Sequence, residues 1–155
     1  MSTQATDMTI RRSVKVNRSV EDAFALFTDG IGSWWPLESH SIGSGRDGVT
    51  AETAILEGGE GGRLYERMSD GAEASWGAVV AWEPPHRVVI SWHVNPKRTA
   101  ATEVEVRFAP DGDGTRVELE HRGWERLGAE AEDARSGYSS QSGWEAVLAR
   151  YVEVA

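Results

Sequence analysis

His121 is well placed to do chemistry, because it ends an alternating run of apolar side chains. Val117 and Leu119 precede it at intervals of two, which in a strand puts all three side chains on one face. An imidazole on a buried face could donate a hydrogen bond to a ligand carbonyl or act as a general base. The alternative is a structural histidine that is hydrogen-bonded to the backbone or to a tyrosine.

Tyr65 and Glu66 offer further polar groups, but only one of the two can enter an interior. Neighbouring residues of a strand point to opposite faces of the sheet. A buried Glu66 would suit proton transfer, yet charged side chains are seldom buried without a partner. We therefore expect Tyr65 to face the interior and Glu66 to face solvent.

Large aromatic residues recur where they could wall a pocket for a flat apolar ligand. They are Trp34, Trp35, Trp76, Trp92, Tyr138 and Trp144. Strand alternation places Trp76 on one face with Ala78, Val80 and Trp82, and Trp92 on one face with Val88, Ile90 and Val94. Ordinary core packing is the alternative for most of these side chains. Trp34 and Trp35 adjoin a loop rich in serine and glycine, where the mouth of a cavity would lie.

The C-terminal segment carries small or polar residues on the helix face that we expect to turn inward. Gly137, Ser140 and Gln141 precede Trp144 on this face. Small side chains would leave room for a ligand between this helix and the rest of the protein. The alternative is that tryptophans fill the same space, because protein interiors are densely packed.

The sequence gives little support for a metal site or a phosphate-binding loop. The four histidines show no pair at the spacing of metal ligands, and the chain has no cysteine. The glycines at 58–62 lack the Gly-Lys-Ser/Thr ending of a phosphate loop and predict a hairpin turn. We expect no metal and no cofactor.

The pattern of elements is a strand, a helix, a short helical turn, six strands and a long helix. Alternation predicts strands at 10–17, 50–56, 62–69, 73–82, 87–94, 102–109 and 115–122. Ser19 can cap a helix over the following residues, and a helix is expected from about residue 130 or 134 to 153. Polar residues alternate with apolar ones in the last two strands, so one face of the sheet needs a helical cover. The fold class is α+β.

The composition limits the partners of the protein. The formal net charge of −9 argues against nucleic acid and against anionic membrane surfaces. No apolar run is long enough to span a membrane, and residues 1–7 lack the features of a signal peptide. We expect a cytoplasmic protein with one domain at 8–153 and a flexible N-terminus at 1–7.

Short motifs in a fixed order carry a resemblance over roughly residues 8–152. They are Ala23-Phe24, Phe27-Thr28, Gly32-Ser33-Trp34-Trp35-Pro36, His40-Ser41-Ile42-Gly43, Gly61-Gly62-Arg63-Leu64-Tyr65-Glu66-Arg67, Trp76-Gly77, Trp82-Glu83-Pro84-Pro85, Thr115-Arg116-Val117-Glu118-Leu119-Glu120-His121 and Gly143-Trp144. Together they resemble the START-related (SRPBCC) superfamily, in the branch named after the activator of the heat-shock-protein-90 ATPase. The resemblance implies a helix-grip fold, in which an antiparallel sheet of six to seven strands curves around a long C-terminal helix.

The resemblance also implies a cavity between sheet and helix that binds a small apolar or aromatic molecule. The residues expected to line it are Trp34, Trp35, Tyr65, Trp76, Trp92, His121, Tyr138, Gln141 and Trp144. One alternative is an enzyme of cyclase or hydrolase type with His121 as general base. Another is a protein-interaction module with Trp124 in an exposed apolar patch. The Trp124 region or an exposed strand edge could also support a homodimer.

Overall fold

The computed structural model describes residues 8–41, 50–93 and 101–155. It contains one curved sheet of seven antiparallel strands in the order β1-β7-β6-β5-β4-β3-β2. The strands are β1 (Ile10–Val16), β2 (Ala51–Leu56), β3 (Arg63–Met68), β4 (Glu73–Glu83), β5 (Arg87–Trp92), β6 (Thr102–Asp111) and β7 (Gly114–Arg122). These strands confirm the predicted fold class. Residues 1–7, which were predicted to be flexible, lie outside the described residues, as do Val94 and most of the serine- and glycine-rich loop.

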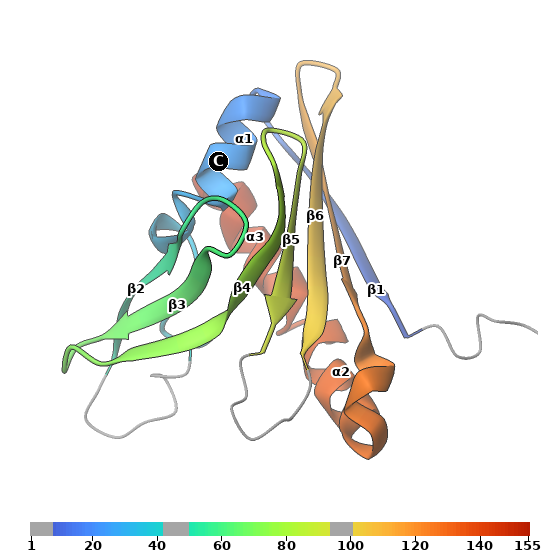
Figure 1. Cartoon of the computed structure of the whole chain (residues 1–155). Coiled ribbons are helices and arrows are strands. Elements are labelled where there is room, and N and C mark those ends of the chain that lie inside the picture. Colours follow the sequence, from blue (N-terminus) through green and yellow to red (C-terminus); the bar gives the residue numbers. More distant parts are fainter. Residues whose placement is uncertain (1–7, 42–49, 94–100) are drawn as a thin grey trace, which may run out of the picture.

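In the described part of the chain, the helices cover one face of this sheet (Figure 1). The first is α1 (Val20–Phe27), which is followed by the short helix η2 (Ile31–Ser33). The Ser19 hydroxyl accepts a hydrogen bond from the Asp22 N–H at 3.1 Å, so the predicted N-terminal cap is confirmed. Alternate residues of β5, β6 and β7 point toward the helices and are almost fully buried: Val88, Ile90, Trp92, Val104, Val106, Phe108, Val117, Leu119 and His121.

The helical C-terminal segment is interrupted where the sequence pattern predicts one helix. It consists of η4 (Trp124–Glu130), α2 (Ala131–Ser139) and α3 (Trp144–Val154). Ser140 has an extended backbone, and its hydroxyl bonds back to the Gly137 carbonyl at 2.8 Å. A Cβ at Gly143 would lie 2.2 Å from the Tyr138 carbonyl oxygen, so the chain passes closely over the end of α2. This tight break places α2 and α3 on either side of a recess.

Strand β4 departs from simple alternation in two places. The pairing shifts by one residue near Trp76 on the β3 side and near Val80 on the β5 side. Each such β-bulge adds an unpaired residue and moves the following side chains to the other face. Trp76, Val79 and Trp82 therefore turn toward the helices, whereas Val80 is 47% exposed. The prediction that Val80 shares a face with Trp76 is wrong for this reason.

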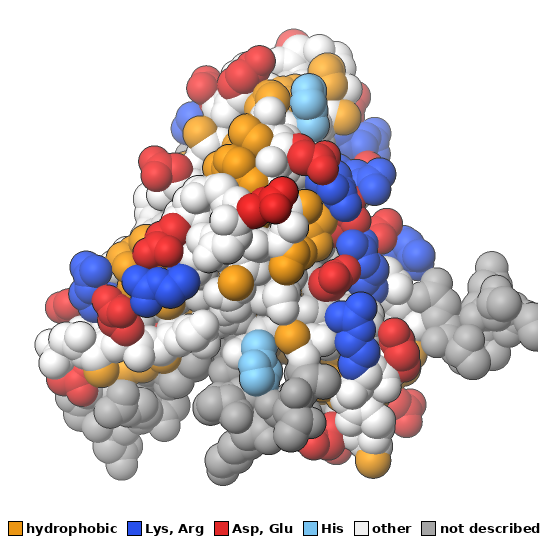
Figure 2. Space-filling view, viewed as in Figure 1, with side chains coloured by type: hydrophobic (Ala, Val, Ile, Leu, Met, Phe, Trp, Pro, Cys, Tyr) orange, Lys and Arg blue, Asp and Glu red, His pale blue; other side chains and the backbone are white. Residues whose placement is uncertain are grey.

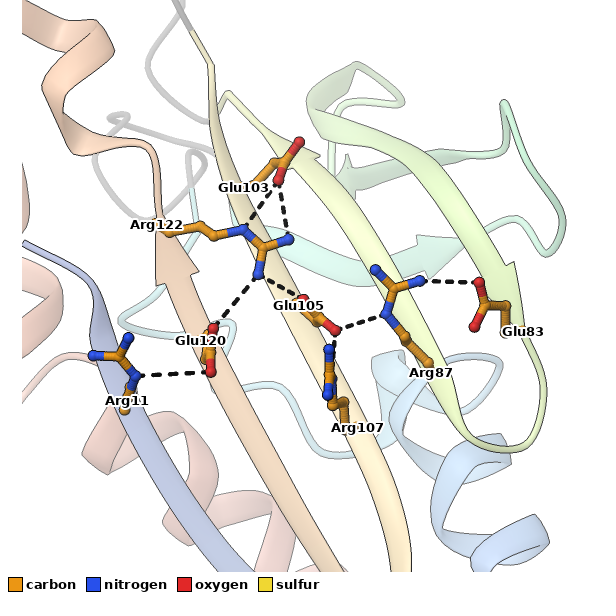
Figure 3. A network of polar contacts seen from close by, with 8 residues as sticks. All are labelled: Arg11, Glu83, Arg87, Glu103, Glu105, Arg107, Glu120 and Arg122. Carbon is orange, nitrogen blue, oxygen red and sulfur yellow. Dashed lines mark hydrogen bonds and ion pairs between the residues drawn. The ribbon is translucent and has the colours of Figure 1, made fainter. Parts of the chain in front are cut away.

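The other face of the sheet carries charged side chains of both signs (Figure 2). Glu105 of β6 lies at the centre of a network of such side chains that joins neighbouring strands (Figure 3). Its carboxylate accepts hydrogen bonds from Arg87 and Arg122, each at 2.6 Å, and from Arg107 at 2.5 Å. Burial alone raises the pKa of Glu105, but these hydrogen bonds lower it to about 2. The charged network thus ties β5, β6 and β7 together on the solvent side.

Candidate functional site

A pocket of about 300 Å³ lies between the sheet, the loop after η2 and the break between α2 and α3. Aromatic side chains from all of these parts form its walls. Its lining comprises Trp35, Ser39, His40, Ser41, Trp76, Trp92, Gly137, Tyr138, Ser142, Gly143, Trp144 and Val147. The volume is at the lower end of the range of about 300–1,000 Å³ that is usual for small-molecule sites.

Four indoles in the pocket wall pack against one another and are nearly buried. Trp35 contacts Trp76 with ring centroids 5.0 Å apart, and Trp92 contacts Trp144 at 5.3 Å. Every one of these indole N–H groups has a hydrogen-bond acceptor. The pairs are Trp35 with the His40 carbonyl, Trp76 with Glu66, Trp92 with the Tyr138 hydroxyl, and Trp144 with His121. These hydrogen bonds therefore fix the orientation of the wall.

Glu66 rather than Tyr65 faces the interior of the fold, contrary to the prediction, although Tyr65 is only 6% exposed. Glu66 is fully buried, and one carboxylate oxygen accepts the Trp76 indole N–H at 2.7 Å. Tyr65 lies on the opposite face, where the Arg63 guanidinium carbon stands 4.2 Å from the centre of its ring. The partner that makes the burial of Glu66 tolerable comes from the neighbouring strand β4, and a single-strand pattern does not reveal it.

His121 is buried as its alternation predicts, but it stands behind the pocket wall rather than in it. The Trp144 indole donates to Nδ1 at 2.9 Å, which requires the tautomer with the proton on Nε2. That Nε2–H donates to the Thr102 hydroxyl at 2.7 Å. Burial lowers the pKa of His121 to about 3. The imidazole is neutral with both nitrogens engaged, and this arrangement fits the structural alternative.

The rim of the pocket is polar and is built from two distant parts of the chain. His40 Nε2 lies 2.6 Å from the Ser142 carbonyl oxygen, and His40 Nδ1 lies 2.7 Å from the Ser39 hydroxyl. Ser41 also faces the pocket, while its hydroxyl donates to the Leu37 carbonyl at 2.7 Å. The pocket therefore combines an apolar wall with a polar edge.

Five of the residues expected to line a cavity do line this pocket: Trp35, Trp76, Trp92, Tyr138 and Trp144. Trp34 packs instead in the core, with its ring 5.0 Å from that of Tyr151. Gln141 is exposed in the break after α2 and does not line the pocket. Sequence reasoning missed Ser39, His40 and Ser142, although an adjacent serine and histidine beside Trp34-Trp35 is a signal that could have drawn attention to the rim.

Trp124 is buried rather than exposed. It is 1% exposed, and its indole N–H donates to the His121 carbonyl at 2.9 Å. Within the described residues, the large hydrophobic side chains that are exposed are Val80, Val152 and Val154. The sequence argument for an interaction module through Trp124 is thereby removed. A homodimer through the outer edges of β1 or β2 stays a prediction.

Comparison with known proteins identifies the family. Residues 17–154 match the family described as activator of Hsp90 ATPase homolog 1-like protein. The chain therefore belongs to this family, a branch of the SRPBCC superfamily. No curated protein matches the chain. In the described residues, no helix is both long and apolar enough to cross a membrane.

Solved structures extend this relationship. An anthrahydroquino-γ-pyrone synthase, solved as a complex, is 36% identical over 95% of this chain and 96% of its own, with a TM-score of 0.61. The self-sacrificing resistance protein CalC from Micromonospora echinospora is 27% identical over 96% of this chain and 94% of its own, with a TM-score of 0.68. The Aha1 dimer from Colwellia psychrerythraea is 15% identical over 94% of each chain, with a TM-score of 0.60, and supports the fold alone.

Proposed function

We propose that this protein binds a flat, aromatic small molecule in the pocket between the sheet and the break of the C-terminal helices. The observation that carries the proposal is the wall of four hydrogen-bonded indoles, Trp35, Trp76, Trp92 and Trp144. Aromatic faces favour offset stacking or edge-to-face contact with another ring. A rigid wall of this kind costs little conformational entropy on binding.

The relatives support an aromatic ligand of several fused rings. The synthase that is 36% identical to this chain is named for an anthrahydroquino-γ-pyrone, a fused aromatic system. Its similarity extends over nearly the full length of both chains. A pocket of about 300 Å³ with aromatic walls is suited to a compact planar compound better than to a long flexible one.

Catalysis through His121 is not part of this proposal. Both ring nitrogens of His121 are engaged by Thr102 and Trp144, and the ring does not line the pocket. A general base must reach the proton that it abstracts directly or through a water or hydroxyl, whereas the Trp144 indole beside His121 can only donate. We assign His121 a positioning role, in which it fixes the plane of the Trp144 indole.

A ligand titration with a blocked pocket tests the binding proposal. Gly137 lines the pocket, and a Cβ built there meets nothing within 4 Å, so Gly137→Phe is chosen to place a ring in the pocket without contact at its Cβ. Ser136→Phe, at an exposed neighbouring position outside the lining, is the matched control. The probe is alizarin dimethyl ether, a planar aromatic compound without a free hydroxyl, and a saturated fatty acid is the comparison.

We expect saturable quenching of tryptophan fluorescence by the planar probe and none by the fatty acid. Gly137→Phe should weaken binding by about tenfold or more, equivalent to a loss of about 1.4 kcal/mol, while Ser136→Phe should bind as the wild type does. Absence of saturable binding, or equal affinity in the Gly137→Phe variant, would contradict the proposal.

A further inference from the structure

The rim of the pocket contains a short chain of proton donors and acceptors that the binding function does not require. It consists of Ser39, His40 and Ser142, and each of these residues borders the pocket. The Ser39 hydroxyl lies 2.7 Å from His40 Nδ1, and His40 Nε2 lies 2.6 Å from the Ser142 carbonyl oxygen. The described part of the chain contains a second such histidine in His121, but that ring stands behind the wall.

The partners of His40 determine which ring nitrogen carries the proton. A carbonyl oxygen can only accept a hydrogen bond, so Nε2 must donate to Ser142. In the neutral ring Nδ1 is then an acceptor, and the Ser39 hydroxyl donates to it. This leaves the lone pairs of the Ser39 oxygen to accept a hydrogen bond from a group in the pocket.

We propose that Ser39 and His40 form a proton relay that ionises a phenolic hydroxyl of the bound aromatic ligand. The ligand O–H donates its proton to the Ser39 oxygen, and the Ser39 proton moves to His40 Nδ1. The products are a phenolate and an imidazolium, so atoms and charge balance without any further reactant. The inference rests on the proposed function, because the ligand must occupy the pocket for its hydroxyl to reach Ser39.

Contacts to the ring and the backbone of His40 hold the residue in place at the rim. The Ser142 carbonyl continues to accept from Nε2 in the imidazolium and stabilises its charge. The Glu38 carboxylate on the same loop is bound mainly by Arg150 of α3, at 2.7 Å, and interacts with His40 more weakly. The Trp35 indole donates to the His40 carbonyl at 2.7 Å and holds the residue against the aromatic wall.

The relay narrows the class of ligand. A planar aromatic compound with a hydroxyl at its edge would stack on the indoles and place that hydroxyl at the serine-lined rim. Imidazole exchanges protons readily near neutral pH, which makes it suitable for activating a phenol for ring closure or transfer. Ser39 is the group that touches the ligand, and His40 acts through it.

Alizarin, a dihydroxyanthraquinone, gives a direct optical test because its visible absorption moves to longer wavelength when a hydroxyl ionises. Alizarin and its dimethyl ether are added to the wild type, His40→Gln, Ser39→Ala and His86→Gln. A glutamine at position 40 can still donate to the Ser142 carbonyl but cannot take up a proton. His86 is exposed in the turn between β4 and β5 and serves as the matched control.

We expect alizarin bound to the wild type and to His86→Gln to ionise at a pH about one unit lower than in solution, a tenfold shift in its equilibrium. His40→Gln and Ser39→Ala should still bind the dimethyl ether saturably, because the four indoles are unchanged, and should lose this shift. The relay is overturned if bound alizarin shows no shift in the wild type, or if both variants retain it. Failure of the dimethyl ether to bind at all would instead refute the proposed binding function.

Discussion

The indole of Trp144 depends on a histidine that lies outside the pocket lining. His121 accepts its N–H at Nδ1, donates to Thr102 from Nε2, and packs between Trp144 and Trp124 with ring centroids 5.8 and 4.1 Å away. A buried donor or acceptor that loses its hydrogen-bond partner lowers the stability of the fold by about 1–3 kcal/mol. The arrangement therefore couples the pocket wall to the protonation state of one buried ring.

His121 should make the protein less stable in mild acid. Burial lowers its pKa from 6.5 to about 3, so the native ring stays neutral while the unfolded ring becomes protonated as the pH falls below 6.5. The stabilisation from the neutral ring is therefore fully present above pH 6.5 and declines as the pH falls from 6.5 toward 3. In urea unfolding, the stability gap between the wild type and His121→Gln should narrow by about 2 kcal/mol from about pH 7 to about pH 5.

His86→Gln is the control, because His86 is exposed and should leave the pH dependence unchanged. A gap between the wild type and His121→Gln that stays constant over the same range would show that the native state tolerates a protonated His121, contrary to the hydrogen bonds described.

Alternation along β7 was sufficient to predict that His121 is buried. The same reasoning failed for Tyr65 and Glu66, because alternation says that two neighbours face opposite ways but not which of them faces inward. The deciding feature is the Trp76 indole on the next strand, which supplies Glu66 with a donor at 2.7 Å. Similarly, the His40–Ser142 contact joins residues 102 positions apart, a distance that no local pattern can span.

Among the elements, the outer faces of β5, β6 and β7 depend on Glu105. The carboxylate is held by three arginines, and its side chain is only 5% exposed. Since its pKa is lowered from 4.5 to about 2, the stabilisation is present above about pH 4.5 and is lost as the pH falls toward 2. Glu105→Gln should destabilise the protein by about 2 kcal/mol at neutral pH, a value reduced by the partial exposure of the arginines.

Chemical denaturation of the wild type and Glu105→Gln at several pH values measures this effect, and the difference should shrink toward zero in strong acid. Glu118→Gln on β7 is a suitable control, because no hydrogen bond or ion pair of the kind around Glu105 is described for its carboxylate. Equal losses in both variants would mean that net charge, rather than the arginine network, sets the stability.

Alanine substitution should have opposite effects on stability at two glycines near the break between α2 and α3. A Cβ at Gly143 would lie 2.2 Å from the Tyr138 carbonyl oxygen, whereas a Cβ at Gly137 meets nothing within 4 Å. Gly143→Ala should therefore lower the free energy of unfolding by about 1–3 kcal/mol, because the backbone must move to make room. Gly137→Ala should raise it by up to about 1 kcal/mol, because alanine favours the helix. Thermal unfolding of the two variants checks both changes in stability. A Gly143→Ala variant as stable as the wild type would contradict the tight break.

Strand positions were predictable because alternation is clear in β6 and β7, and because glycine or proline follows most of the strands. The two bulges of β4 were not, since a bulge depends on pairing with β3 and β5 and leaves no reliable mark in the strand itself. The helix break was missed for a related reason. Gly137, Ser140 and Gln141 were interpreted as a small inward stripe of one helix, while Ser140–Gly143 in fact form its interruption.

At the scale of the whole molecule, the order of elements predicted an antiparallel sheet with a C-terminal helical cover. The resemblance added the curvature of the sheet, and family membership supports it. The core and the pocket belong to one continuous set of aromatic contacts, from Phe24 and Phe27 through Trp34 and Trp35 to Trp144. The sequence predicted most of this set, because large aromatic residues are rarely left in solvent. It could not predict which of them border empty space, since that depends on the helix break.

The most direct test of the central claim, that this pocket binds a planar aromatic ligand, uses the tryptophan indoles as reporters. The chain has seven tryptophans, and proton–nitrogen correlation spectra resolve each indole N–H. On titration with alizarin dimethyl ether, we expect saturable shifts for Trp35, Trp76, Trp92 and Trp144, while Trp34, Trp82 and Trp124 stay unchanged. Shifts confined to the second group, or no saturable shift in the first, would contradict the account.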